Sequence, residues 1–71
     1  MTEDKKAICE LLCKTLQATR NGADIISIQY TDDYTSGEEY AVITFKNGYA
    51  KQICVTADSG TAMILDIVRG V

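Results

Sequence analysis

The spacing of apolar residues changes twice along this chain, from helical to alternating and back to helical. Between Glu3 and Arg20 the apolar residues recur every three or four positions, which predicts an amphipathic helix with a stripe of Ile8, Leu11, Leu12 and Leu16. Apolar and polar residues alternate from Ile26 to Thr31, which is typical of a half-buried strand, and two more strands are expected at Glu39–Lys46 and Tyr49–Thr56. The polar, turn-rich stretch Thr31–Glu38 between the first two strands is expected to be a loop. Helical spacing returns between Ala57 and Arg69, with one stripe of Gly60, Ile64, Ile67, Val68 and Val71 and with Met63 and Leu65 off it.

These changes predict an α+β fold with the element order helix-β-β-β-helix. The chain has 71 residues, which gives room for one small domain spanning residues 1–71. We expect a two-layer sandwich in which both helices pack on one face of a three-stranded antiparallel sheet. Asn21 and Gly22 are expected to end the first helix, with the glycine in the left-handed conformation. Thr56 or Asp58 is expected to cap the second.

The turn between Glu39–Lys46 and Tyr49–Thr56 sets the register of the last two strands. A two-residue Asn-Gly loop would place Phe45 opposite Ala50. A three-residue loop with Gly48 in a left-handed bulge position pairs Phe45 with Tyr49 instead. We favour the three-residue loop because it gathers the apolar residues on one face, where only Lys51 does not fit the apolar pattern. The apolar residues of this face are Ala41, Ile43, Phe45, Tyr49, Ile53 and Val55.

The opposite face of the sheet is expected to carry almost no charge. Its residues are Ile25, Ser27, Gln29, Tyr40, Val42, Thr44, Ala50, Gln52 and Cys54. Such a surface is either an ordinary strand surface or, because interface cores are depleted of charge and contain tyrosine, a contact surface. We predict a homodimer, with Ile25, Val42, Thr44, Gln52 and Cys54 forming the dimer or partner face.

The segment between the first two strands combines carboxylates with tyrosines. The residues are Tyr30, Asp32, Asp33, Tyr34, Glu38, Glu39 and Tyr40. They predict a surface that imitates nucleic-acid phosphates and occupies a basic groove on a partner protein; the alternative is a solvated loop. The spacing lacks the alternating oxygen ligands of a calcium loop.

Several classes of function are disfavoured by the composition. The chain has no histidine and three cysteines, so we expect no metal, no cofactor, no nucleophile–histidine catalysis and no enzyme activity. The odd number of cysteines favours reduced thiols and a cytoplasmic location. The net charge of −3 argues against direct nucleic-acid binding, and no apolar run is long enough to span a membrane.

The element order and one tetrapeptide each resemble a known family, but the residues needed for the function of that family are not predicted here. The element order resembles that of the double-stranded RNA-binding domain, but the start of the second helix is acidic and has no lysine. Asp58-Ser59-Gly60-Thr61 resembles the signature of aspartic proteases, whereas helix capping explains the same residues more simply. Ser59 and Thr61 also leave open the binding of a nucleotide phosphate at the helix start.

The second half of the chain resembles small phage and prophage proteins of Firmicutes. The resemblance lies in Glu39–Tyr49 and Val55–Ile64, and the Thr-Ala-Asp-Ser-Gly stretch is its most specific part. Size, charge and element order are also similar to those of some anti-CRISPR proteins. The resemblance implies a non-enzymatic phage accessory protein in the cytoplasm of a bacterial host, which binds and inhibits a host protein, for example a defence effector. The alternatives are a dimeric sponge for a nucleotide signal and a regulatory or structural factor of the phage.

Overall fold

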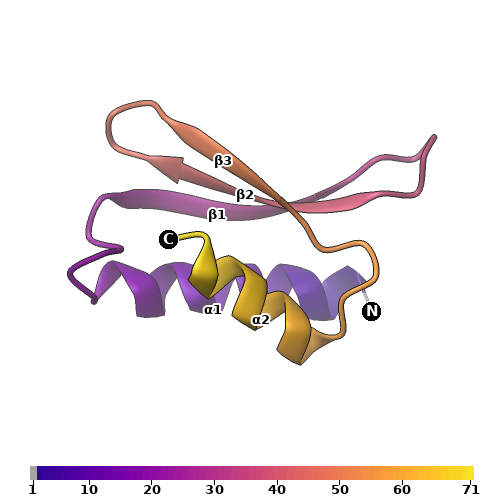
Figure 1. Cartoon of the computed structure of the whole chain (residues 1–71), viewed down its shortest axis with the longest axis horizontal. Coiled ribbons are helices and arrows are strands. Elements are labelled where there is room, and N and C mark those ends of the chain that lie inside the picture. Colours follow the sequence, from indigo (N-terminus) through magenta and orange to yellow (C-terminus); the bar gives the residue numbers. More distant parts are fainter. Residues whose placement is uncertain (1) are drawn as a thin grey trace.

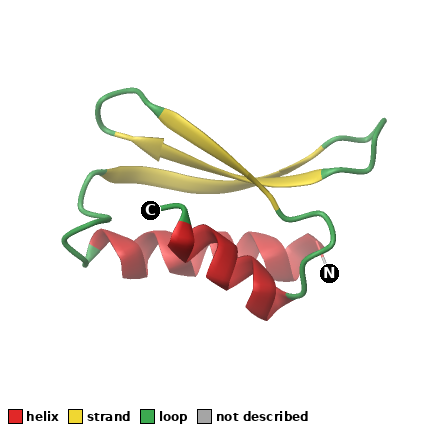
Figure 2. Cartoon of the chain, in the orientation of Figure 1, coloured by secondary structure: helices red, strands yellow, loops and turns green. Residues whose placement is uncertain are grey.

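The structure, a computed structural model, describes residues 2–71, with side chains from Asp4 onward. Its elements in chain order are α1 (Thr2–Gln17), β1 (Ile25–Asp32), β2 (Glu39–Phe45), β3 (Ala50–Cys54) and α2 (Gly60–Arg69). The strands form one antiparallel sheet in the order β1-β2-β3. Both helices lie on the same side of this sheet (Figure 1), and the two layers are distinct in Figure 2. The predicted α+β fold with the order helix-β-β-β-helix is confirmed.

The β2–β3 turn has the predicted three-residue loop. Ala41 lies opposite Ile53, and the Phe45 amide donates to the Tyr49 carbonyl at 2.8 Å. Gly48 has a φ of 88°, a left-handed conformation that glycine adopts without steric cost. Because the side chains of a strand alternate between faces, this register sends the apolar set of β2 toward the helices.

A bulge at the start of β1 moves Ile25 to the inner face of the sheet. Ile25 pairs with Phe45 and Ser27 pairs with Thr44, so β1 has one extra residue between these two pairs. Ile25 is only 2% exposed, whereas Ile26 is 54% exposed. The side of the sheet that is turned away from the helices is called the open face below. The prediction that Ile25 belongs to this open face is therefore wrong, because strict alternation does not anticipate a bulge.

The helix α1 turns a different side to the sheet than its leucine pattern predicted. Cys9 and Leu16 are buried and so is Lys5, whereas Leu11 is 66% exposed. Cys9 is therefore a core residue, and the buried stripe is rotated toward the two helical cysteines.

The chain leaves α1 through a close approach of two backbone segments. Gly22 does not adopt the predicted left-handed conformation, since the positive-φ residues of the described chain are Gly37 and Gly48. A Cβ atom on Gly22 would lie 2.1 Å from the carbonyl oxygen of Leu16. Glycine is required there because any side chain would collide with backbone.

The helix α2 begins later than predicted and has a different cap. Ser59 is its N-cap, and the Ser59 hydroxyl oxygen accepts a hydrogen bond from the Ala62 amide at 3.3 Å. The predicted start at Ala57, with Thr56 or Asp58 as the cap, is wrong.

Met63 and Ile67, four residues apart, are the fully buried side chains of α2. Ile64 and Val68, which were expected on the buried stripe, are 37% and 44% exposed. The helix is amphipathic, but its buried side is centred on the methionine that the pattern placed off the stripe.

The core lies between the two layers and is almost entirely aliphatic. Its buried members are Cys9, Leu16, Ile25, Ile28, Ala41, Ile43, Val55, Met63 and Ile67. Lys51, which does not fit the apolar pattern of the sheet face that packs on the helices, donates from Nζ to the Gly70 carbonyl at 2.7 Å. A cation is favourable there because Gly70 follows the C-terminus of α2. Neither helix, over residues 2–71, has the length and apolar character needed to cross a bilayer.

Candidate functional site

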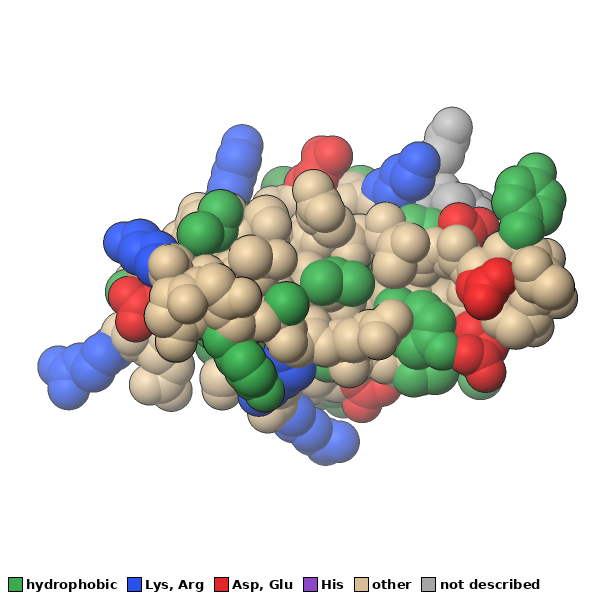
Figure 3. Space-filling model, turned by 90° about the horizontal axis from the view of Figure 1, so that it is seen from above, with side chains coloured by type: hydrophobic (Ala, Val, Ile, Leu, Met, Phe, Trp, Pro, Cys, Tyr) green, Lys and Arg blue, Asp and Glu red, His purple; other side chains and the backbone are tan. Residues whose placement is uncertain are grey.

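Most of the predicted partner-binding residues lie together at one end of the sheet. Asp32 ends β1, Asp33, Tyr34 and Glu38 belong to the loop that follows, and Tyr40 is in β2. All of these side chains are exposed except that of Tyr40, which is half-buried. Acidic side chains, in red, gather at this end in the view of Figure 3. We call this group, residues Asp32, Asp33, Tyr34, Glu38 and Tyr40, the acidic loop surface.

The acidic loop surface is held in shape by the backbone of its own loop. The Asp33 amide donates to the Glu38 carbonyl at 2.8 Å, and the Gly37 amide donates to the Asp33 carbonyl at 2.8 Å. The Asp33 carboxylate accepts the Thr35 amide at 2.9 Å. Hydrogen bonds from the Thr35 and Ser36 amides lower the pKa of Asp33, so this carboxylate stays ionised and the loop presents a fixed negative charge.

A tyrosine and a glutamate of the acidic loop surface are bonded to one another. The Tyr40 hydroxyl donates to the Glu38 carboxylate. This bond is the main reason that the pKa of Tyr40 is raised to about 12. Tyr40 therefore remains a neutral donor, and it fixes one acidic side chain at the border between the loop and the open face of the sheet.

Two of the predicted partner-binding residues point the other way, into the layer between sheet and helices. Glu39 accepts hydrogen bonds from the Tyr30 hydroxyl and from Lys5 Nζ, the latter at 2.9 Å. Lys5 also donates to the Val55 carbonyl at 2.9 Å. The Tyr30 and Lys5 bonds lower the pKa of Glu39. Tyr30 and Glu39 are thus part of an internal polar cluster and not of the acidic loop surface.

Lys5 is the residue that the sequence pattern missed. It precedes Cys9 by four positions, so it lies on the buried side of α1 one turn earlier. A lysine on the buried side of a helix indicates a buried acceptor, because an unpaired buried charge is very costly.

The open face of the sheet is uncharged over three cross-strand rows. The strand registers align Ser27, Thr44 and Ala50 in one row and Gln29, Val42 and Gln52 in the next. The third row is Thr31, Tyr40 and Cys54. Figure 3 looks onto this face: its centre is mostly polar or hydrophobic, and the charged side chains lie mainly around the margins. Four of the five residues predicted for the dimer or partner face (Val42, Thr44, Gln52 and Cys54) lie here, whereas Ile25 does not.

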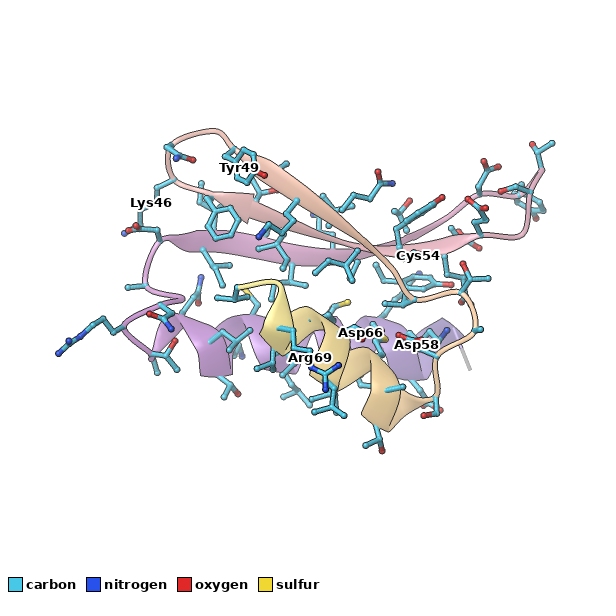
Figure 4. All side chains as sticks on the ribbon, viewed as in Figure 1. Lys46, Tyr49, Cys54, Asp58, Asp66 and Arg69 are labelled. Atoms are coloured by element: carbon cyan, nitrogen blue, oxygen red, sulfur yellow. The ribbon has the colours of Figure 1, made fainter. Side chains whose placement is uncertain are left out.

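Asp58, which precedes α2, and Asp66, in the second half of that helix, are neighbouring carboxyl groups (Figure 4). The hydrogen bond with Asp66 is the largest cause that raises the pKa of Asp58, followed by burial. Asp58 Oδ2 is buried, and no donor within the described residues reaches it. Ser59 beside it is used as the helix cap, as the capping interpretation of this tetrapeptide implies.

The thiols differ in their surroundings. Cys9 is buried, Cys13 is half-buried and Cys54 is exposed on the open face. Burial is the main cause that raises the pKa of Cys9 to about 11, so its thiol is protonated and unreactive at neutral pH. Across residues 2–71, with side chains from Asp4 onward, no three His, Cys, Asp or Glu side chains are grouped so as to hold a metal ion.

Fold and surface together define a small α+β domain with an uncharged open sheet face bordered by an acidic loop. Comparison of the chain with protein-family models, with curated proteins and with solved structures finds no match. The candidate site therefore rests on its own geometry.

Proposed function

We propose that this protein is a non-enzymatic binding protein whose acidic loop surface occupies a basic groove on a partner. The observation that carries the proposal is the position of this surface: Asp32, Asp33 and Glu38 are exposed at the edge of a sheet face that has no charge of its own. A fixed cluster of carboxylates beside an uncharged surface supplies electrostatic steering together with an area that can be desolvated.

The partner in this proposal is a host protein that the domain inhibits. The resemblance to phage and prophage proteins supports a bacterial host, the cytoplasm as the location and a defence effector of the kind that anti-CRISPR proteins inhibit. The internal bonds of Tyr30 and Glu39 limit the contact surface to the five residues of the acidic loop surface. The uncharged open face supports self-association of two copies.

The test is a capture experiment with charge-matched variants. Tagged protein is captured from the lysate of a bacterial host and its complexes are weighed by native mass spectrometry. The loop variant Asp32→Asn/Asp33→Asn/Glu38→Gln removes three negative charges and keeps an oxygen at position 33 for the Thr35 amide. We expect wild-type protein to capture one host protein in stoichiometric amount and the loop variant to lose it.

A control variant removes the same number of charges elsewhere. Asp4→Asn/Glu10→Gln/Asp24→Asn changes three acidic residues that are exposed outside the loop, so it has the same net charge as the loop variant. This control is expected to retain the host protein. Retention by the loop variant, or equal loss by both variants, would contradict the proposal.

A further inference from the structure

The two edges of the sheet differ in how they are covered. In the order β1-β2-β3 the edge strands are β1 and β3 (Figure 1). At the start of β1, Gln17 of α1 donates from Nε2 to the carbonyls of Ile25 and Ile26 at 2.8 and 3.4 Å. Further along this strand, Ile28 is only 4% exposed. The first half of the β1 edge is therefore covered by α1 and by the core.

At the other edge, the backbone groups of three β3 residues face away from the sheet. The Phe45 amide donates to the Tyr49 carbonyl at 2.8 Å, and the Val55 amide donates to the Glu39 carbonyl at 2.9 Å. Successive residues of an antiparallel strand direct their amide and carbonyl groups alternately toward the paired strand and away from it. The odd-numbered residues of β3 therefore bond to β2. The even-numbered residues direct their amides and carbonyls to the free edge; they are Ala50, Gln52 and Cys54.

These outward groups are accessible. Ala50, Gln52 and Cys54 are all exposed. Within residues 2–71, with side chains from Asp4 onward, no hydrogen bond from another segment reaches their amides or carbonyls. The end of α2 lies beneath β3, on the helix side, where Lys51 donates to the Gly70 carbonyl. The free edge of β3 is therefore open to a further strand.

β3 also lacks the features that usually protect a free edge. Proline, a bulge or an outward-pointing charge keeps edge strands from pairing with another chain. β3 contains no proline, and its register with β2 is regular over all five residues. Its charged residue, Lys51, points to the helix side and is bonded to the Gly70 carbonyl. The strand is therefore a template on which an extended chain can pair.

We propose that an extended segment of a partner protein adds to the edge of β3 as a fourth, antiparallel strand. The antiparallel direction is the more stable one per residue, and it lets Ala50, Gln52 and Cys54 each exchange two hydrogen bonds with the residue opposite. This mode of recognition takes its affinity from the backbone and its specificity from alternate side chains. The acidic loop surface takes no part in this site, and the proposal therefore goes beyond the proposed function.

The side chains of β3 define the chemistry of the added segment. Lys51 and Ile53 are half-buried on the helix side, and the residues opposite them form the closer, non-hydrogen-bonded pairs. Only one hydrogen of the Lys51 ammonium group is needed for the Gly70 carbonyl, so its charge favours an acidic residue opposite. Ile53 favours a β-branched apolar residue. The other positions continue the uncharged open face, so the segment reads, from its N-terminus, uncharged, apolar, uncharged, acidic, uncharged.

The probe is the terminally blocked peptide Thr-Val-Thr-Glu-Thr-Val, and its control has lysine in place of glutamate. In the antiparallel register the glutamate lies opposite Lys51, and the last valine lies opposite Tyr49, which is 57% exposed. We expect NMR titration at low salt to show binding of the probe below about 5 mM, at least about threefold tighter than the control. General attraction to a protein of net charge −3 would favour the lysine peptide instead. Failure of the probe to bind at about 5 mM, or a preference for the lysine peptide, overturns the proposal.

Reversal of the Lys51 charge tests the register of the added strand. Lys51→Glu is expected to exchange the preference and to bind the lysine peptide more tightly. Circular dichroism checks the fold of this variant, because the bond to the Gly70 carbonyl is lost. The control Lys14→Glu makes the same change of charge at an exposed residue of α1, and it is expected to keep the preference of the wild type. An unchanged preference in folded Lys51→Glu overturns the proposal.

Strand addition is tested on the wild-type chain by N-methylation of the probe. Methyl groups on its first, third and fifth residues block the amides that face β3 and are expected to abolish binding. Methyl groups on its second, fourth and sixth residues leave those amides free, so this peptide is expected to bind as the probe does. Equal binding of the two methylated peptides would overturn strand addition.

Hydrogen exchange identifies the edge that is occupied. At half saturation the probe is expected to slow exchange of the Ala50, Gln52 and Cys54 amides about twofold, and unchanged exchange of all three overturns the proposal. Slow exchange of these amides in the protein alone, increasing with protein concentration, would show that a second copy of the chain occupies the edge, and it would also overturn the proposal.

Discussion

The ammonium group of Lys5 lies 2.9 Å from the carboxylate of Glu39, beneath the sheet and 34 residues away in sequence. The same ammonium group donates to the Val55 carbonyl at 2.9 Å. One side chain from α1 therefore joins the first residue of β2 to the residue that follows β3. Its own exposure is only 6% and that of Glu39 is 21%, so both charges are largely removed from water and depend on one another.

Replacing Lys5 with methionine is expected to lower the free energy of unfolding by about 2 kcal/mol, because Glu39 and the Val55 carbonyl lose their donor while the apolar stem is kept. Urea denaturation measures the change. The neighbouring substitution Lys6→Met removes an exposed charge and is expected to change stability by less than about 0.5 kcal/mol. Equal effects of the two substitutions would contradict a structural role for the Lys5–Glu39 pair.

Glu39 is expected to make the protein sensitive to acid. Its pKa is lowered from the ordinary value of 4.5 by the Tyr30 and Lys5 hydrogen bonds. The unfolded chain therefore takes up this proton at a higher pH than the folded chain. The stabilisation is present above about pH 4.5 and is lost as the pH falls toward the lowered pKa of the folded state.

Urea midpoints measured between about pH 2 and pH 7 test this acid limb. Glu39→Gln is expected to show a shallower loss than wild type, and the loss that remains is expected to include the contribution of Asp33, whose pKa is also lowered. Parallel curves for wild type and Glu39→Gln would exclude Glu39 as a source of acid sensitivity.

Asp58 is expected to have the opposite effect. Its pKa is raised above 3.8 by Asp66 and by burial, so the folded state favours the protonated carboxyl and is penalised when the group ionises. Asp58→Asn is expected to raise the urea midpoint at pH 7 and to lose this advantage as the pH falls toward the ordinary pKa. A lower midpoint for Asp58→Asn at pH 7 would show that the charge of Asp58 is favourable.

Two glycines are expected to differ in their tolerance of alanine. Gly48→Ala strains a left-handed residue in open space and is expected to cost about 1 kcal/mol. Gly22→Ala places a Cβ atom 2.1 Å from the Leu16 carbonyl oxygen, so backbone must move and we expect a loss of more than about 2 kcal/mol. Thermal unfolding of the two variants gives the order, and a more stable Gly22→Ala would contradict the close approach at the end of α1.

The open face is expected to join two copies of the chain. Light scattering at high micromolar concentration should give the mass of a dimer for wild type and of a monomer for Thr44→Lys/Gln52→Lys, which places two charges on this face. Ala18→Lys/Asn21→Lys adds the same charge at exposed positions outside it and should remain a dimer. A monomeric wild type, or identical masses for the two variants, would contradict dimerisation through the open face.

The order of the elements and the register of the second hairpin could be predicted from the amino-acid sequence alone. Helical and alternating spacing are local properties of the sequence. The apolar residues on both sides of Gly48 gather on one face of the hairpin with the three-residue loop, which pairs Phe45 with Tyr49. The same alternation identified the uncharged outer rows of β2 and β3, because side-chain direction in a regular strand follows from position alone.

Features that depend on contacts between distant segments could not be predicted from local spacing. The bulge at Ile25 arises from pairing with β2, and the buried side of α2 is set by how the helix packs against the core, so spacing alone misplaced both Ile25 and Met63. Glu39 looked like part of an acidic loop, because a pattern of charges does not show which carboxylate has a buried lysine within reach. The partner of Glu39 is 34 residues earlier in the chain, and only the packing of α1 beneath the sheet brings the two charges together.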